Sequence, residues 1–358
     1  MSKSLPIIQG RGVNSNPPNR FEKITIEPDF EHVEGDEEYF QSIARPTTDY
    51  LIDTSKTIIA TNDSPDVGFT HSINPYRGCS HGCVYCYARP THEWLGFSAG
   101  LDFETKIMVK RDAPQLLRQA LSSAKYTPVS LSMSGVTDCY QPAERTFQIT
   151  RACLEVLAEF QNPVAIITKN HLVTRDIDLL ADLASIDAAV VLVSITTLDP
   201  DLSQRMEPRT SVPRRRLEAV RALTSAGIPT GVMVAPVIPG LTDHEMPAIL
   251  EAAAESGARS AGFVPVRLPF AVAELFEAWL ADHFPDRKDK VLNRIRSLRG
   301  GNLNDPNFVT RMRGEGLWAD QLKSMFEMAK RRSGIADDLP SLSTGHFRHP
   351  KEQQQTFW

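Results

Sequence analysis

The sequence has little of three things: cysteine, net charge and long apolar runs. Its 358 residues include only five cysteines, and this odd number, with three of them inside one short segment, argues against a disulfide framework. The formal net charge is −5, so no overall positive field marks the chain as a nucleic-acid-binding protein. The first residues form no apolar stretch typical of a signal peptide. No apolar run is long enough to span a bilayer, and we therefore expect a soluble, cytoplasmic protein without a membrane partner.

The chain is expected to fold in three parts. Residues 1–65 are rich in Pro, Asn, Asp and Glu, and we interpret them as a partly flexible N-terminal extension. Residues 66–270 alternate short apolar runs with helical patterns and form the core domain. Residues 271–358 are expected to form a helical C-terminal region, basic over most of its length, that ends in a polar tail.

Six strand–helix units follow one another between residues 67 and 280. The expected strands cover 67–74, 129–133, 164–168, 189–195, 230–235 and 261–266, and the expected helices cover 113–122, 147–160, 175–184, 214–225, 243–255 and 272–280. A further short strand is expected over 105–110. Apolar strands that alternate with helices predict an α/β fold with a parallel sheet. This pattern fits an open barrel or a doubly wound sheet, and in both folds ligands bind at the carboxyl ends of the strands.

The strongest signal is a loop with three cysteines directly after the first expected strand. Cys79, Cys83 and Cys86 have the spacing C-x3-C-x2-C. Three thiolates on one short loop are suited to bind three irons of a [4Fe–4S] cluster. No fourth cysteine lies nearby, so one iron would be open to a small molecule with an amine and a carboxylate. Gly78 and Gly82 allow the backbone to wrap closely around such a cluster.

A structural zinc site is the alternative for these cysteines. One of His71, His81 and His92 would complete a Cys3His tetrahedron. Structural zinc sites usually combine two clusters of ligands, and the sequence offers no second pair. We therefore favour the iron–sulfur cluster and keep a non-catalytic Fe–S or zinc module as the competing hypothesis.

The cysteine spacing, together with Tyr85 directly before the last cysteine, resembles the defining motif of the radical S-adenosylmethionine (SAM) superfamily. The resemblance covers about residues 66–270 and implies a partial (β/α)6 barrel of the TIM type. It also implies that SAM binds the fourth iron, and that reductive cleavage of SAM yields a 5′-deoxyadenosyl radical that abstracts hydrogen from a substrate. A low-potential electron donor of the flavodoxin or ferredoxin type would supply the electron.

A finer resemblance, to the branch that contains spore photoproduct lyase, rests on polar segments that follow the expected strands. These segments are 134–144, 166–170, 194–197 and 207–210. The SAM contacts that the resemblance implies are Tyr85, Thr137, Asp138, Lys169, Ser194 and Arg209. In this set Lys169 would neutralise the SAM carboxylate. Each residue also has an ordinary structural alternative, such as a solvated lysine, a helix-capping aspartate or a hydroxyl that satisfies the backbone.

One departure from that branch concerns the group that quenches the product radical. Spore photoproduct lyase uses a cysteine there, whereas this chain has Gly135 at the corresponding position and Cys139 four residues later. We expect Cys139 to be inert and Cys153 to be a core residue. The difference counts against thymine-dimer repair. A DNA lesion repair lyase therefore stays an alternative to a radical SAM reaction, of the lyase or another type, on an unknown substrate.

Nucleic acid stays an alternative partner because of two basic regions. The residues 214–216 are all arginine, and a basic stretch runs from Arg287 to Arg313 with Trp318 just beyond it. Solvated helix faces have the same composition and are more common. A nucleic-acid-binding protein with a structural cluster would bind in a salt-dependent way and would not cleave SAM.

Overall fold

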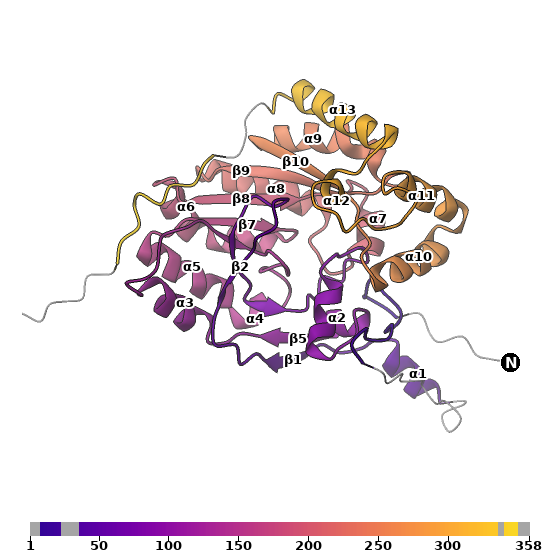
Figure 1. The fold of residues 1–358 in the computed structure, drawn as a ribbon, viewed down its shortest axis with the longest axis horizontal. Coiled ribbons are helices and arrows are strands. Elements are labelled where there is room, and N and C mark those ends of the chain that lie inside the picture. The colour runs from indigo at the N-terminus through magenta and orange to yellow at the C-terminus, as the bar shows by residue number, and fades with distance from the viewer. Residues whose placement is uncertain (1–7, 23–35, 336–339, 350–358) are drawn as a thin grey trace, which may run out of the picture.

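The computed structural model describes residues 8–22, 36–335 and 340–349 (Figure 1). Within them, the main sheet has the strand order β10-β9-β8-β7-β6-β3-β2. The strands are β2 (Ile59–Thr61), β3 (His71–Ile73), β6 (Leu131–Met133), β7 (Val164–Thr168), β8 (Ala189–Ser194), β9 (Thr230–Val237) and β10 (Ser260–Pro265). The strands from β3 to β10 pair in parallel and in chain order, whereas β2 pairs antiparallel with β3.

Helices join the parallel strands and cover the sheet. They are α3 (Ala113–Leu121), α4 (Glu144–Phe147), α5 (Ile149–Phe160), α6 (Ile177–Ala184), α7 (Pro200–Met206), α8 (Pro213–Ser225) and α9 (Met246–Glu255), with the 3-10 helices η2 (His171–Asp176) and η3 (Asp243–Glu245). Figure 1 shows α3, α5 and α6 along one side of the sheet. The structure confirms the predicted α/β fold, and β2 and β10 form the two edges of an open sheet.

A small second sheet, in the order β1-β5-β4, lies before the first crossover helix in sequence. Its strands are β1 (Asp49–Ile52), β5 (Lys106–Val109) and β4 (Tyr76–Arg77). The strand β5 confirms the short strand expected over 105–110. The strands β1 and β2 lie in the segment interpreted as an extension, and the sequence did not predict them. Each has only three or four residues, with mostly exposed side chains, so no alternation marks it.

The remaining helices precede the first crossover helix α3 or follow β10 in sequence. They are α1 (Glu37–Ile43), η1 (Arg89–Leu95), α2 (Leu101–Thr105), α10 (Ala271–His283), α11 (Pro285–Ser297), α12 (Thr310–Arg313) and α13 (Leu317–Arg332). The helix α13 packs against α9, and α10 packs against α11 and η1. Across the described part of the chain, no helix has both the length and the apolarity needed to cross a bilayer.

Two apolar cores hold these layers together. The larger core lies between the main sheet and its helices and includes Ala189, Val191 and Val193 of β8, a strand whose six side chains are all buried. The smaller core joins the cysteine loop to the C-terminal helices. It packs Val84 and Tyr85 of that loop with Phe276 of α10 and Ile295 of α11. The C-terminal helices therefore help to fix the cysteine loop.

Candidate active site

The cysteine loop follows β3 and β4 and ends at η1. Cys79 and Cys83 are buried, Cys86 is half-buried, and all three are free thiols. Burial raises the pKa of each of these thiols. A metal that binds here must therefore displace a proton from each sulfur.

Segments far apart in the sequence hold the backbone of this loop. The Gln141 side chain accepts a hydrogen bond from the Ser80 N–H and donates one to the Gly78 carbonyl, each over 3.0 Å. The Val84 N–H donates to the carbonyl of Met206, at the end of α7, over 3.0 Å. The loop is therefore fixed independently of any bound group.

A buried ion pair lies beside the loop. Nη2 of Arg89 is 2.5 Å from Oε1 of Glu104, and both side chains are fully buried. Arg89 also donates from Nε to the Cys83 carbonyl over 3.0 Å. Gly82 has a φ of +70°, and a Cβ there would stand 2.6 Å from Oε2 of Glu104. A residue with a side chain would be strained at this position and would displace the carboxylate.

The zinc alternative requires a different arrangement of ligands. A single zinc ion needs ligands that converge on one point. Within the described residues, no group of three or more His, Cys, Asp or Glu side chains is arranged to hold a metal ion. In a [4Fe–4S] cluster the thiolates bind separate irons, so the same convergence is not required.

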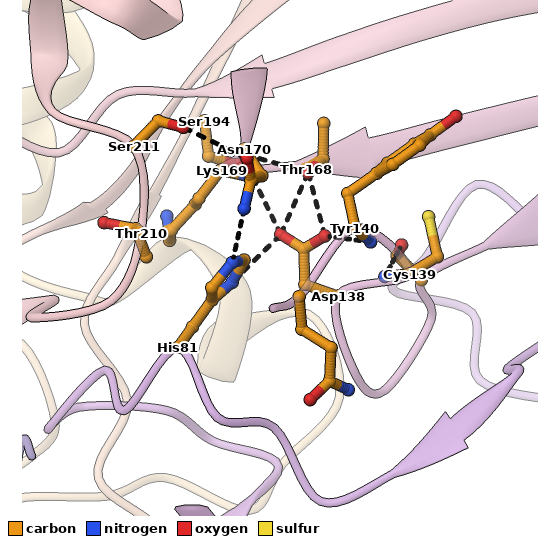
Figure 2. A network of polar contacts seen from close by, with 12 residues as sticks. His81, Asp138, Cys139, Tyr140, Thr168, Lys169, Asn170, Ser194, Thr210 and Ser211 are labelled. Carbon is orange, nitrogen blue, oxygen red and sulfur yellow. Dashed lines mark hydrogen bonds and ion pairs between the residues drawn. The ribbon is translucent and has the colours of Figure 1, made fainter. Parts of the chain in front are cut away.

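The Asp138 carboxylate lies in the loop after β6 and is saturated by protein donors (Figure 2). It accepts from the Thr168 hydroxyl over 2.8 Å and from the Lys169 backbone N–H over 2.8 Å. Its Oδ2 lies 3.4 Å from Nδ1 of His81, and Nε2 of His81 lies 3.1 Å from the Asn170 amide. Burial would raise the pKa of Asp138, but His81 and these hydrogen bonds outweigh it and lower that pKa. Asp138 thus joins the cysteine loop to the carboxyl end of β7.

A second buried carboxylate, Glu207, lies at the end of α7. It accepts hydrogen bonds from the Tyr85 hydroxyl, from Arg216 and, over 2.8 Å, from the Thr196 hydroxyl. Nζ of Lys169 lies 3.7 Å from Oε1 of Glu207. Burial would raise the pKa of Glu207, but Arg216 and Lys169 outweigh it and lower the pKa to about 2. Glu207 therefore holds Tyr85 and Lys169 in one ionic network.

Three of the residues predicted to contact SAM lie near one another. Lys169 follows β7, its Nζ donates to the Ala235 carbonyl over 2.8 Å, and this Nζ lies 5.9 Å from the centre of the Tyr85 ring. Ser194 is the last residue of β8 and is drawn beside Lys169 in Figure 2. Among the described residues, its hydroxyl has no recorded hydrogen bond, although its carbonyl accepts from Arg216 over 3.0 Å.

The structure does not bring Thr137 and Arg209 into this group. The Thr137 hydroxyl donates to the Tyr76 carbonyl over 2.8 Å, so it holds the strand before the cysteine loop. The Arg209 side chain is exposed, and it donates to the Thr48 hydroxyl over 3.3 Å. Only the backbone of Arg209 touches the loop, through an N–H that donates to the His81 carbonyl over 3.2 Å.

The two cysteines outside the loop are both fully buried. The Cys139 N–H donates to the Ser134 hydroxyl over 3.0 Å, and burial raises the pKa of the Cys139 thiol well above its ordinary value. Figure 2 shows Cys139 on the opposite side of Asp138 from His81. Cys153 lies on α5 in the larger core. Neither thiol is exposed to a substrate in this conformation.

Sequence reasoning did not propose Glu207 or Arg216 as site residues. Glu207 does stand in the segment 207–210 that was singled out, but the candidate chosen there was Arg209. The partners of Glu207 lie 122 residues away, at Tyr85, and nine residues away, at Arg216. Neither separation is a helix or strand period, so no local pattern could have shown these contacts.

Comparisons with known proteins identify the family of the chain and relatives of its fold. The family model of the radical SAM superfamily matches residues 73–253, which include the cysteine loop and Ser194. An uncharacterized protein of Mycobacterium tuberculosis (strain ATCC 25618 / H37Rv) is 35% identical over 248 residues, which are 68% of this chain and 72% of that protein. An uncharacterized protein of Methanocaldococcus jannaschii is 31% identical over 178 residues, or 50% of this chain and 64% of that protein.

Among solved structures, the fold is similar to that of spore photoproduct lyase. The structure of that lyase complexed with dinucleoside spore photoproduct has a TM-score of 0.57 and 16% identity, over 79% of each chain. A mutant of the lyase with bound AdoMet and the same dinucleoside has a TM-score of 0.54 and 17% identity, over 79% of this chain and 77% of that chain. At this identity the likeness shows a shared fold.

Proposed function

This chain belongs to the radical SAM superfamily, and we propose that Cys79, Cys83 and Cys86 hold its [4Fe–4S] cluster. The protein is therefore an enzyme whose cofactors are that cluster and SAM. When bound, they supply one-electron cleavage of SAM and the 5′-deoxyadenosyl radical that abstracts hydrogen from a substrate. The observation that supports the assignment is the loop itself, with three free thiols on a backbone already fixed by Gln141 and Arg89.

We assign the recognition of SAM to Lys169, Ser194 and Tyr85. The Lys169 ammonium and the Ser194 hydroxyl lie at the carboxyl ends of β7 and β8, where ligands bind in parallel α/β folds. The ammonium suits a carboxylate, and the Ser194 hydroxyl has no recorded partner in the described part of the chain. The buried Tyr85 ring, fixed through Glu207, offers a flat surface for an adenine.

Asp138 and Thr137 receive a different role. Their recorded side-chain hydrogen bonds all go to the protein, and both residues join the loop after β6 to the cysteine loop or the strand before it. We therefore assign them to positioning the cysteine loop. We do not assign Arg209 to SAM recognition, because its side chain is exposed.

We propose three parts for the chain: an N-terminal part, residues 1–65, a core domain, residues 66–270, and a C-terminal region, residues 271–358. The substrate is expected at the carboxyl ends of the parallel strands of the core domain. The electron comes from a low-potential donor of the flavodoxin or ferredoxin type. The cytoplasm is the compartment that we propose for this oxygen-sensitive chemistry.

A DNA lesion repair lyase is the second candidate function. A cleft of about 560 Å³ is lined by Arg287, Lys290 and Arg294 of α11 and by Trp318 of α13. The Arg294 guanidinium lies 4.5 Å from the Trp318 ring centre. Cations beside a half-buried aromatic ring are suited to a nucleic-acid strand. The buried thiol of Cys139 counts against quenching of a product radical from this residue.

The test of the leading function is an anaerobic assay. The protein is reconstituted with iron and sulfide, reduced with dithionite and given SAM, and 5′-deoxyadenosine is measured. We expect a yield in the wild type that disappears in Cys83→Ala and persists in Cys153→Ala. Uptake of zinc in place of a cluster, or a cluster that never cleaves SAM, would overturn the proposal.

The test of the second candidate function is a binding experiment. Salt-dependent binding of an oligonucleotide that is lost in Arg287→Glu would support a DNA lesion repair lyase.

A further inference from the structure

A pocket of about 460 Å³ lies beside the cysteine loop, between the N-terminal segment and the segment that follows α7. Its charged lining is Arg11, Arg45 and Arg209, and its other lining residues are uncharged. We call this site the arginine pocket. Arg45 and Arg209 are exposed, so a partner can reach them from solvent.

The three arginines have no ion pair among the described residues. Arg11 and Arg209 both donate to the Thr48 hydroxyl, over 2.9 and 3.3 Å, and the other hydrogen bonds of Arg11 go to backbone carbonyls. Arg45 donates to the Gln9 side-chain carbonyl over 3.0 Å. All of these acceptors are neutral, so within the described residues none of the three guanidinium groups is paired with a carboxylate.

Like charges in the arginine pocket also oppose one another. Burial and the charge of Arg209 lower the pKa of Arg11, and the Glu104 carboxylate offsets only part of this. Glu104 itself is held in the buried ion pair with Arg89. In a chain with a net charge of −5, this local excess of positive charge would be relieved by a bound anionic surface.

The wall of the arginine pocket is in contact with the cysteine loop at two points. The Arg209 backbone N–H donates to the His81 carbonyl over 3.2 Å. Gly12, which follows Arg11, lies so close to Gly82 that a Cβ on it would stand 1.6 Å from the Gly82 carbonyl oxygen. His81 and Gly82 are both between the first two cysteines of the loop. A protein bound at the pocket is therefore separated from the loop by a single layer of chain.

The arginine pocket and the proposed SAM site lie on opposite sides of the segment that follows α7, because Glu207 and Arg209 of this segment point in different directions. Glu207 is 1% exposed and binds Tyr85 and Lys169 in the interior. Arg209, two residues later, is exposed and lines the arginine pocket. The same short segment thus presents one face to the interior and another to solvent.

We propose that the arginine pocket is the docking surface for the electron donor, a protein whose redox group lies near an acidic surface. The proposal rests on the proposed function, since only a reductively cleaved cofactor needs such a donor. Electron transfer slows steeply with distance, and this exposed, positively charged surface lies against the cysteine loop. Charge complementarity across such a surface raises the association rate and makes binding weaken as the salt concentration rises.

The test compares two reductants on the reconstituted holoenzyme. Formation of 5′-deoxyadenosine is measured with dithionite, a small molecule, and with flavodoxin reduced by its reductase. The variants are Arg45→Glu, Arg45→Lys and, as a control at an exposed position of α8, Arg221→Glu. Arg45 is exposed and its recorded bond goes only to Gln9, so we expect these variants to fold.

We expect Arg45→Glu to raise the KM for flavodoxin about tenfold or more, with a weaker dependence on salt than the wild type. Arg45→Lys should stay within about twofold of the wild type because it keeps the positive charge, and Arg221→Glu should do so because a surface charge away from the interface contributes little. All three should keep the wild-type rate with dithionite.

Three results would overturn the proposal. One is an unchanged KM for flavodoxin in Arg45→Glu. Another is a wild-type enzyme that dithionite reduces but flavodoxin does not. The third is loss of affinity for a single-stranded oligonucleotide in Arg45→Glu with an unchanged KM for flavodoxin, which would make the pocket a nucleic-acid site. Absence of 5′-deoxyadenosine with dithionite in the wild type would instead reject the proposed function itself.

Discussion

Nδ1 of His81 lies 3.4 Å from Oδ2 of Asp138, which joins the cysteine loop to the loop after β6. Asp138 also accepts from the end of β7 through Thr168 and Lys169. The Asp138 carboxylate therefore fixes the position of the cysteine loop relative to β6 and β7 of the main sheet. A change at Asp138 is expected to act on the protein before any cofactor binds.

Asp138→Asn should destabilise the protein without the cluster. The amide keeps the size of the carboxylate but loses its charge and one acceptor, and the loss of a hydrogen-bonded buried charge costs about 1–3 kcal/mol in the free energy of unfolding. Urea denaturation measures this loss. Asp182→Asn, at an exposed position of α6, is the control and should have a free energy of unfolding close to that of the wild type. Equal values for both variants would contradict a positioning role for Asp138.

Glu207→Gln should be more damaging than Asp138→Asn. It leaves the Arg216 guanidinium buried without its carboxylate, and a broken buried ion pair typically costs about 3–5 kcal/mol. The free energy of unfolding is again measured by urea denaturation. A loss below about 1 kcal/mol would show that Glu207 and Arg216 act independently, as exposed pairs do.

The same carboxylate predicts how stability depends on pH. Its pKa is lowered from 4.5 to about 2 in the folded protein. Its contribution is therefore complete above the unfolded pKa and is lost as the pH falls toward 2. We expect the cluster-free wild type to lose more stability than Glu207→Gln when the pH falls from about 5 to about 3. Parallel losses in the two proteins would assign the pH dependence to other groups.

The sequence predicted the repeating part of the fold well and the irregular part poorly. The run 189–195 showed β8 directly, because parallel strands buried on both faces are almost continuously apolar. β1 and β2 were missed because they are short and mostly exposed. Their positions come from pairing with β5 and β3, which is a tertiary effect.

The sequence could indicate the candidate site only where its signal is local. The spacing of the three cysteines could be seen within eight residues, whereas the partners of Glu207 come together only in the folded chain. Thr137 was predicted as a SAM contact, and in the structure its hydroxyl donates to the Tyr76 carbonyl. A sequence position at the end of a strand does not determine whether a hydroxyl binds a ligand or the backbone.

Lys169→Met should weaken the binding of SAM. A charge-assisted hydrogen bond to a carboxylate contributes about 1.5–3 kcal/mol, so the Kd for SAM should rise about tenfold to hundredfold. Equilibrium dialysis of SAM against the reconstituted protein measures the Kd. Lys125→Met, at an exposed position before β6, is the matched control. Equal Kd values in both variants would remove Lys169 from the SAM site.

The five thiols should differ in reactivity in the cluster-free protein. Cys86 is half-buried, whereas Cys139 and Cys153 are fully buried, and burial raises the pKa of both buried thiols. Alkylation by iodoacetamide, followed by mass spectrometry, should therefore modify Cys86 before Cys139 or Cys153. Early modification of Cys139 would show that its thiol reaches solvent. Cys139 would then be a candidate to donate a hydrogen atom to a product radical.

The central claim is that three cysteines bind the cluster and leave one iron for SAM. Electron paramagnetic resonance of the reduced, reconstituted protein, recorded with and without SAM, tests it most directly. The account predicts a [4Fe–4S] signal that changes when SAM is added, in the wild type and in Cys153→Ala, and that is lost in Cys83→Ala. A cluster signal that SAM leaves unchanged, or one that survives in Cys83→Ala, would contradict it.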